Sequence, residues 1–237
     1  MAEPLLMSVT RVSTFVGDFA LTAGSGFFFE RGEKLFLVSS RHVFIDEPAR
    51  HLPDRIEFVV HTDATDLTRW QPVSLPLYAG GKAAWRQATD SGGEIDVAVI
   101  EIPRTLLPPR LHMTCFGPGS LAADLDVAEA GTPLLLVGFP LGFYDTLHHL
   151  PVVRQAVIAS AFGVRFQGQG FFLTDARMHR GASGAPVVLR RAGGAFPWTL
   201  LGVHSSRLDM KNRDQVQDES LGLNCAWYAD ILKTLTA

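Results

Sequence analysis

Residues 178–188 read Met-His-Arg-Gly-Ala-Ser-Gly-Ala-Pro-Val-Val, and the assignment of the fold starts from this stretch. Its serine, Ser183, lies between small residues, and an apolar run of strand type follows at once. Small residues allow a tight backbone turn and the close approach of a substrate. Such a turn can direct two backbone N–H groups at one point beside the hydroxyl, as an oxyanion hole requires. The alternative is a glycine-rich turn that merely leads into a strand.

The composition is that of a globular protein with a large core. Of 237 residues, 47% are hydrophobic and 19% are charged, which leaves no sign of long disordered tracts. This length suits one large all-β unit or two small domains that share a cleft. Lys and Arg number 21 against 24 Asp and Glu, a formal charge of −3, and the basic residues are scattered. We therefore expect no nucleic-acid partner.

The cysteines and the N-terminus indicate a cytoplasmic protein. Cys115 and Cys225 are the two cysteines of the chain, too few for a disulfide framework and without metal-type spacing. Two reduced thiols are the favoured interpretation, and a single bridge is the alternative. The start, Met1 to Pro4, lacks the basic and apolar regions of a signal peptide. No apolar run is long enough for a membrane span, so we expect no membrane association.

Short apolar and alternating runs predict many β-strands. A terminal helical face over 227–235 follows the last strand, and 22–26 reads as a turn. The proline-rich segment 103–131 separates two halves of about six strands each, and 207–220 reads as an exposed polar loop. The predicted strands cover 9–16, 27–29, 34–39, 55–60, 71–77, 83–89, 94–102, 132–140, 152–160, 171–175, 185–189, 198–204 and 221–226.

This pattern predicts an all-β fold with two six-stranded antiparallel β-barrels and a short C-terminal helix. The boundary is expected near 115, with an N-terminal barrel over 1–115 and a C-terminal barrel plus helix over 116–237.

A histidine and an aspartate precede the serine in settings that suit catalysis. His42 follows a buried strand, Asp96 opens another, and Ser183 comes third, with separations of 54 and 87 residues. A serine hydroxyl needs a neighbouring base to take its proton, and imidazole has a suitable pKa. The base needs a carboxylate that fixes its tautomer. Asp90 is a rival for this carboxylate, but it lies in a turn, where aspartates usually cap their own backbone.

These segments resemble those of trypsin-like, chymotrypsin-fold serine proteases, and they are closest to the bacterial intracellular and high-temperature-requirement types. The resemblance rests on four segments: residues 24–29 with 37–43 around the histidine, 95–99 around the aspartate, 174–186 around the serine, and the strand 201–206. It covers roughly residues 20–232.

The resemblance implies a role for each matching residue. Ser183 would be the nucleophile, His42 the general base and Asp96 the orienting carboxylate. The N–H groups of Gly181 and Ser183 would form the oxyanion hole. Backbone atoms of His204, Ser205 and Ser206 would bind the substrate chain as an added strand. The implied function is that of a serine endopeptidase that cleaves protein or peptide substrates through an acyl-enzyme. The resemblance implies no metal or organic cofactor, and it is compatible with a regulatory or effector protein partner.

The sequence departs from the family pattern at two positions. Ala185 stands where the family usually has a second glycine, which adds only a methyl group. Ala182 stands where the secreted digestive members have an aspartate that pairs with a newly cleaved N-terminus. Because no Ile-Val-Gly-Gly start is present either, we do not expect activation by cleavage of a pro-segment.

Substrate preference is left open between two alternatives. His204 occupies the position at which the similar glutamyl endopeptidases have a histidine that contacts an acidic side chain, and Arg177 and Arg180 are expected nearby. These residues permit a preference for Glu or Asp before the scissile bond. A small or aliphatic preference, with His204 as an ordinary strand residue, is the alternative.

Three other interpretations compete with the protease. A metal pair at His148 and His149 is disfavoured, because adjacent strand residues point to opposite faces. An α/β-hydrolase would need Gly at 185 and a histidine after the acid, whereas His204 precedes Asp209. A catalytically silent, protease-like peptide-binding module remains the alternative from another functional class.

Overall fold

The computed structural model describes residues 2–207 and 222–237. The loop expected over 207–220 lies outside these residues from position 208 onward. No helix in the described ranges is long and apolar enough to cross a membrane.

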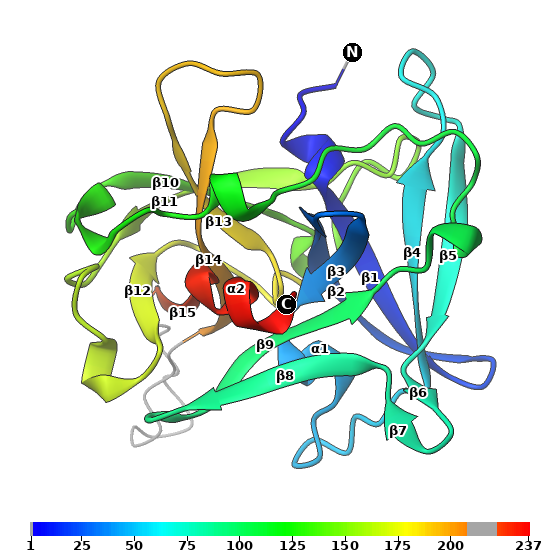
Figure 1. Ribbon diagram of the computed structural model, residues 1–237, viewed down its shortest axis with the longest axis horizontal. Helices are drawn as coiled ribbons and strands as arrows, with labels where there is room; N and C mark the ends of the chain where they lie inside the picture. The colour runs from blue at the N-terminus through cyan, green and yellow to red at the C-terminus, as the bar shows by residue number, and fades with distance from the viewer. Residues whose placement is uncertain (1, 208–221) are drawn as a thin grey trace.

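The first half of the chain forms one seven-stranded antiparallel sheet, in the order β5-β4-β1-β2-β3-β9-β8 (Figure 1). Helix α1 follows β3, and β6 and β7 form a separate small hairpin. The elements are β1 (Val9–Val16), β2 (Phe19–Arg31), β3 (Lys34–Ser39), α1 (Arg41–Phe44), β4 (Arg55–His61), β5 (Trp70–Pro76), β6 (Tyr78–Ala79), β7 (Lys82–Ala83), β8 (Trp85–Asp90) and β9 (Gly93–Glu101).

Strand β2 corrects one expectation, because 22–26 is not a turn but part of this long strand. It pairs with β1 from Phe19 to Phe27. Gly24 and Gly26 are needed because neighbouring side chains leave no room for a Cβ. A Cβ on Gly24 would lie 2.8 Å from Val43 Cγ2, and one on Gly26 would lie 2.8 Å from Val12 Cγ2. The glycines of this segment therefore indicate close packing within a strand and not a turn.

The second half forms a closed barrel in the order β10-β11-β12-β15-β14-β13, which lies on the left of Figure 1. A 3₁₀ turn and a short helix end the chain, as the sequence predicts. The elements are β10 (Pro133–Gly138), β11 (Val152–Ile158), β12 (Phe171–Asp175), β13 (Pro186–Arg190), β14 (Trp198–Arg207), β15 (Leu223–Tyr228), the 3₁₀ helix Ala229–Ile231 and α2 (Leu232–Leu235). Further 3₁₀ turns cover Leu6–Ser8, Arg104–Leu106, Pro118–Ser120, Leu125–Val127, Pro140–Gly142 and Phe166–Gly168.

The all-β class, the closed six-stranded barrel and the C-terminal helix are therefore confirmed. The first half has seven strands in its sheet rather than six. Both outer strands, β5 and β8, place side chains such as Leu75 and Trp85 in one common core, so the sheet curls around it. Closure of this sheet into a second barrel, and a domain boundary near 115, stay predictions.

Three hydrophobic clusters hold the molecule together. One fills the first half, one fills the barrel, and the largest joins the halves through residues such as Phe27, Val137 and Leu200. Burying a side chain of this size stabilises the fold by about 1.5–3 kcal/mol. The two halves therefore share one continuous apolar core between them.

The C-terminal helix also ties the halves together, since it packs on the first half and lies near β8 and β9 at the centre of Figure 1. Arg86 donates to the carbonyls of Leu235 and Ala237 at 3.2 and 2.9 Å. Arg31 donates to the Lys233 carbonyl at 2.6 Å. These bonds also satisfy carbonyl groups that a helix end leaves without partners.

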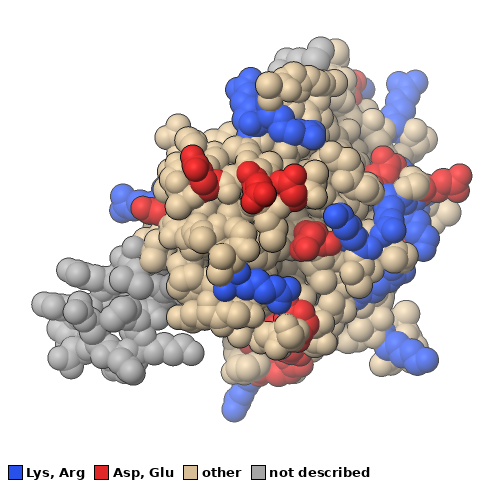
Figure 2. Space-filling view, turned by 60° about the vertical axis from the view of Figure 1, so that its left-hand side comes forward, with Lys and Arg blue, Asp and Glu red and all other residues tan. Residues whose placement is uncertain are grey.

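The face shown in Figure 2 carries both acidic and basic side chains, spread over its surface. Several form exposed ion pairs, such as Arg104 with Glu30 at 2.6 Å and Lys34 with Glu101 at 3.3 Å. Such pairs contribute little to stability.

Candidate active site

The pairing of β3 with β9 brings His42 and Asp96 together. Ser39 at the end of β3 lies opposite Ala98 of β9. Because the strands are antiparallel, the segment after Ser39 runs past the start of β9, where Asp96 lies. Helix α1 begins at Arg41 and carries His42. The imidazole Nδ1 of His42 lies 2.7 Å from Asp96 Oδ2, and the His42 backbone N–H donates to Oδ1 at 2.9 Å.

Asp96 has a third partner on β14, because the Ser205 hydroxyl donates to Asp96 Oδ2. The carboxylate therefore accepts hydrogen bonds from a ring nitrogen, a backbone N–H and a hydroxyl. It is half-buried, with 23% of its side chain exposed, against 35% for His42. This environment fixes the imidazole with Nδ1 toward the carboxylate and leaves Nε2 without a hydrogen-bond partner among the described residues.

The two pKa shifts are those of a bound ion pair. Burial by itself lowers the pKa of His42, but the hydrogen bond and the charge of Asp96, with a contribution from Asp46, raise it above the ordinary 6.5. Burial by itself raises the pKa of Asp96, but the hydrogen bonds and charge of His42 and the hydroxyl of Ser205 outweigh it, so this pKa is lowered. The carboxylate is therefore ionised at neutral pH, and the imidazole is a stronger base than a free one.

Ser183 lies in the turn between β12 and β13, beside β14. The ladder between β13 and β14 continues into this turn: Gly184 N–H donates to the His204 carbonyl at 2.7 Å, and His204 N–H donates to the Ala185 carbonyl at 2.8 Å. The Ser183 hydroxyl donates to the Ser205 carbonyl at 2.9 Å. Ser205 thus contacts Ser183 through its carbonyl and Asp96 through its hydroxyl.

The backbone of the turn has a left-handed residue at Gly181 and two N–H groups without acceptors among the described residues. Gly181 has a φ of +88°, a conformation that favours glycine. The N–H groups of Gly181 and Ser183 donate to no group in the part of the chain that the structure describes. The Arg180 carbonyl accepts from Leu141 N–H at 2.6 Å. Because a trans peptide points its C=O and N–H in opposite directions, the Gly181 N–H faces away from Leu141.

The two departures from the family pattern fit this turn. Ala182 and Ala185 are both completely buried, and Ala182 belongs to the barrel core. An aspartate at 182 would place a charge in this apolar cluster. The methyl group of Ala185 is accommodated without disturbing the ladder to His204.

His204 lies differently from the expected substrate-binding residue. Its backbone groups are engaged by Ala185 and Gly184, and its carbonyl also accepts from the Ser40 hydroxyl at 3.1 Å. Of the three residues 204–206, the prediction of substrate binding through the backbone stays open only for Ser205 and Ser206. The His204 side chain is 2% exposed, its Nδ1 has no hydrogen-bond partner, and burial, with the charge of His42 adding, lowers its pKa to about 4.

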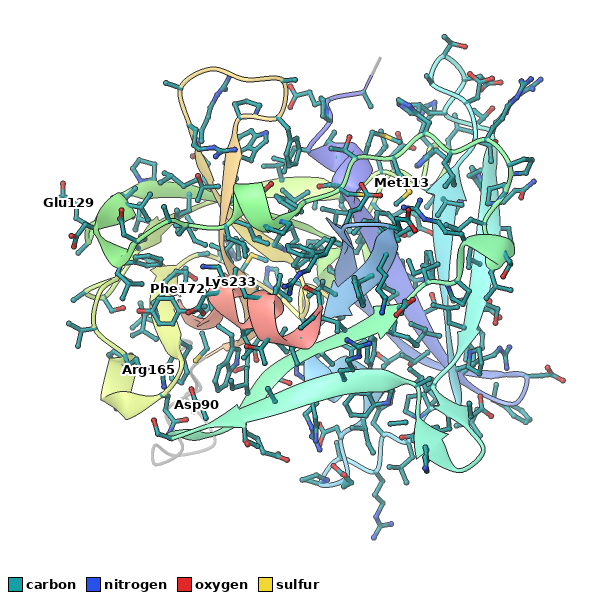
Figure 3. All side chains as sticks on the ribbon, viewed as in Figure 1. Asp90, Met113, Glu129, Arg165, Phe172 and Lys233 are labelled. Atoms are coloured by element: carbon teal, nitrogen blue, oxygen red, sulfur yellow. The ribbon has the colours of Figure 1, made fainter. Side chains whose placement is uncertain are left out.

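Asp90 has partners outside this arrangement. Its carboxylate accepts from Arg165 at 2.6 Å and from Gly92 N–H at 2.7 Å. Figure 3 shows the Asp90 and Arg165 side chains directed at each other at the end of the β8–β9 hairpin. Asp90 therefore caps its own turn and pairs with a cation, while Asp96 is the carboxylate that contacts His42.

Three other candidate residues, Arg177, His148 and His149, lie outside the site. Arg177 is exposed and lines a groove of about 740 Å³ on the barrel, whose lining comes from the barrel strands and residues 175–177 and does not include His42 or Ser183. His148 pairs with Asp145 at 2.7 Å, and the His149 ring packs on Trp70. The described residues contain no group of three or more His, Cys, Asp or Glu placed to hold a metal ion.

The cysteines are free thiols, as the sequence favours. Burial raises the pKa of Cys115 to about 12 and that of Cys225 to about 11. Both thiols are therefore protonated at neutral pH, and neither competes with Ser183 as a nucleophile.

Two serine side chains in this site were not singled out from the sequence. The hydroxyl of Ser205 donates to Asp96, whereas only backbone binding was expected of this residue. The hydroxyl of Ser25 on β2 donates to the Gly181 carbonyl at 2.8 Å. A serine between two glycines at 24–26 is the only sequence signal, and it does not reveal a partner 156 positions away.

Comparison with known proteins gives a family. Residues 24–195 match the family model described as the trypsin-like peptidase domain. No curated protein matches the chain significantly.

Solved structures share the fold at low sequence identity. An HtrA-type protease, AlgW, solved with a tripeptide, matches 98% of this chain at 17% identity with a TM-score of 0.58. The serine endoprotease from Yersinia pestis matches 98% at 15% identity, with a TM-score of 0.56. The chain spans 59% and 62% of these two proteins. An inactivated protease paralogue of the scabies mite also matches 98%, at 15% identity with a TM-score of 0.56, and is spanned to 94%.

Proposed function

Because this chain belongs to the trypsin-like peptidase family, we propose that it is a serine endopeptidase that cleaves peptide bonds through Ser183, His42 and Asp96. The observation that supports this most is the contact of His42 Nδ1 with Asp96 Oδ2 at 2.7 Å beside the turn that carries Ser183. It supplies a base of raised pKa with its second nitrogen free.

In the first half of the reaction, Ser183 Oγ attacks the carbonyl carbon of the scissile bond while His42 Nε2 takes the hydroxyl proton. Asp96 stabilises the imidazolium that forms. The tetrahedral intermediate collapses, the C–N bond breaks, and His42 returns the proton to the leaving amine. Water then attacks the acyl-enzyme with His42 again as base, which releases the carboxylic acid product and restores Ser183.

The N–H groups of Gly181 and Ser183 would stabilise the oxyanion of both intermediates. They are free of other acceptors in the described chain, so no internal hydrogen bond has to break when the oxyanion forms. Preorganised donors of this kind contribute about 10²–10³-fold to turnover each.

The resting Ser183 hydroxyl has to change its acceptor before attack, since it donates to the Ser205 carbonyl. Rotation about χ1 between staggered wells can redirect it toward His42. A substrate strand that pairs with Ser205 would offer its own N–H to that carbonyl and displace the hydroxyl. Binding of substrate would in this way favour the orientation that reacts.

A fluorophosphonate probe tests the function directly, because it reacts only with a serine activated by a base. We expect covalent labelling of the purified protein, with Ser183 as the modified residue by mass spectrometry, and no labelling of Ser183→Ala. The resting bond from Ser183 to Ser205 favours a second candidate, the silent peptide-binding module. Absence of labelling across pH 6–9, together with binding of peptides, would replace the protease by that candidate.

Activity should depend on pH through His42. Only the neutral ring can accept the Ser183 proton, and its pKa is raised above 6.5, so kcat/KM should fall on acidification with a midpoint above that value. A pH series of kcat/KM from 5 to 9 measures this. In Asp96→Asn the ring loses its carboxylate, and the midpoint should move to lower pH. A profile that stays flat down to pH 5 would contradict His42 as the base.

A preference for acidic side chains would depend on His204. Its ring is neutral at pH 7, because its pKa is about 4, and its Nδ1 is buried without a partner. An unpaired buried polar atom costs about 1–3 kcal/mol. If binding uncovers the ring, a substrate carboxylate would accept a hydrogen bond from this nitrogen, in the tautomer that carries the proton there, and would remove that cost.

His204→Ala should therefore lower kcat/KM for substrates with Glu or Asp before the scissile bond by about 10-fold or more, and those with Ala or Leu by much less. Paired substrates that differ at this residue measure the selectivity, and a peptide library reveals any aliphatic preference. Equal losses on all substrates would assign His204 a structural role and remove the acidic preference.

A further inference from the structure

The nucleophile turn is not held in place by local sterics. Gly181 has a φ of +88°, and glycine adopts positive and negative φ about equally readily. The hydrogen bond from Ala182 N–H to the His179 carbonyl at 3.2 Å closes the turn, but such a turn can form with its central peptide in either of two orientations. Contacts from outside the turn therefore decide the orientation of the Arg180–Gly181 peptide, and with it that of the Gly181 N–H.

Ser25 of the first half supplies two contacts to the turn, one through its backbone and one through its side chain. Ser25 is completely buried on β2. Its backbone N–H donates to the Ser183 carbonyl at 2.8 Å. Its hydroxyl donates to the Gly181 carbonyl at 2.8 Å and accepts from Phe139 N–H at 3.0 Å. A single side chain thus joins the nucleophile turn to the segment that follows β10.

The segment after β10 completes the clamp. Leu141 N–H donates to the Arg180 carbonyl, so the carbonyls on both sides of the Gly181 Cα have fixed partners. With both peptide planes held, the Gly181 N–H has one direction left to it. Loss of the Ser25 hydroxyl would free the Gly181 carbonyl and leave Phe139 N–H without its acceptor.

The Ser25 hydroxyl is closely packed against Gly138. A Cβ placed on Gly138 would lie 2.6 Å from Ser25 Oγ, and one placed on Gly181 would lie 2.6 Å from the Phe139 carbonyl. The glycines at 138 and 181 therefore leave just enough space for the hydroxyl and for the close approach of the two segments.

We propose that Ser25 is a positioning residue for the oxyanion hole: its hydroxyl, by bridging the Gly181 carbonyl and Phe139 N–H, holds the Gly181 N–H toward the developing oxyanion. This inference rests on the proposed function. It makes the first half of the protein a part of the oxyanion machinery in addition to its supply of His42 and Asp96.

The test is a comparison of Ser25→Ala with Ser8→Ala. Ser8 is also completely buried in the first half, and its hydroxyl donates to the Leu5 carbonyl at 2.7 Å, away from the nucleophile turn. We expect Ser25→Ala to lower kcat by about 10–100-fold, less than the loss of a whole oxyanion donor, with KM changed less than about twofold. Ser8→Ala should keep the wild-type kcat.

The affinity for a peptide aldehyde distinguishes a positioning role of Ser25 from a merely structural one. Its adduct with Ser183 resembles the tetrahedral intermediate, so its affinity should fall in Ser25→Ala by the same factor as kcat/KM. The affinity for the corresponding peptide alcohol, which forms no adduct with Ser183 and carries no oxyanion, should stay unchanged. A wild-type kcat in a folded Ser25→Ala protein, or equal losses for aldehyde and alcohol, would overturn the proposal.

A second variant displaces the Ser25 hydroxyl without removing it. Gly138→Ala would press its Cβ on Ser25 Oγ, and we expect the same selective fall of kcat. Melting temperatures establish that each variant is folded; if both unfold, the hydroxyl serves folding and the proposal is wrong. A wild-type protein that fails to react with fluorophosphonate would refute the proposed function instead, so the two failures are distinguishable.

Discussion

Asp96→Asn is expected to lower kcat by about 10³- to 10⁴-fold while the protein stays folded. The amide would still accept from the His42 backbone N–H, which now bonds to Oδ1 at 2.9 Å. Its NH₂ group, however, would face His42 Nδ1 and the Ser205 hydroxyl with a donor where both now find an acceptor. The imidazole would turn to its other tautomer, with the proton on Nε2, and could no longer take the proton of Ser183.

Steady-state kinetics measure the fall in kcat, and thermal melting shows whether Asp96→Asn stays folded. The matched control is Asp90→Asn, which makes the same chemical change at the carboxylate that pairs with Arg165 and Gly92. We expect this variant to keep kcat within about twofold, because its partners lie outside the site. A large loss in Asp90→Asn with a near-normal Asp96→Asn would refute the assignment of the carboxylate.

Gly184→Ala is expected to lower the free energy of unfolding by about 4 kcal/mol. A Cβ at this position would lie 2.1 Å from the Ser25 carbonyl oxygen and 2.3 Å from Ser39 Oγ, and the residue has a φ of +88°. Overpacking costs about 1–3 kcal/mol and the left-handed conformation about 1–2 kcal/mol. The contact that would be forced apart is the one that docks the nucleophile turn on β2, so activity should be lost with stability.

Gly194→Ala is the matched control, since Gly194 has a φ of +90° and no atom within 4 Å of its Cβ position. Only the conformational cost of about 1–2 kcal/mol remains there. Denaturant unfolding of both variants separates the two contributions. Equal losses at the two positions would show that the methyl group added at Gly184 causes no overpacking between β2 and the nucleophile turn.

The strands were predictable because their signal is local. The alternation over Val9–Val16 and the apolar run over Lys34–Ser39 predict β1 and β3 with the bounds that the structure has. Each depends on the side-chain period of a strand and not on distant residues. The same local reasoning fails at 22–26, where glycines make room for Val43 and Val12 rather than for a turn.

The chemistry of the candidate site was predictable in type but not in detail. A histidine after a buried strand, an aspartate in the next clear one and a serine among small residues are visible along the chain. The hydroxyl of Ser205 on Asp96 and that of Ser25 on Gly181 are not, because they join residues 109 and 156 positions apart. Such contacts follow from strand order and sheet packing, which periodicity does not encode.

The sequence by itself determined the strand-rich architecture, the terminal helix and the order His42, Asp96, Ser183, since these follow from local side-chain patterns and residue types. Only the tertiary structure decided between Asp96 and Asp90, because the β3–β9 register carries one to His42 and leaves the other with Arg165. It also decided that Ser183 rests on the Ser205 carbonyl and that His204 is buried and neutral. The physical reason is that burial, shared hydrogen bonds and pKa shifts arise from segments that meet only when the two halves pack together.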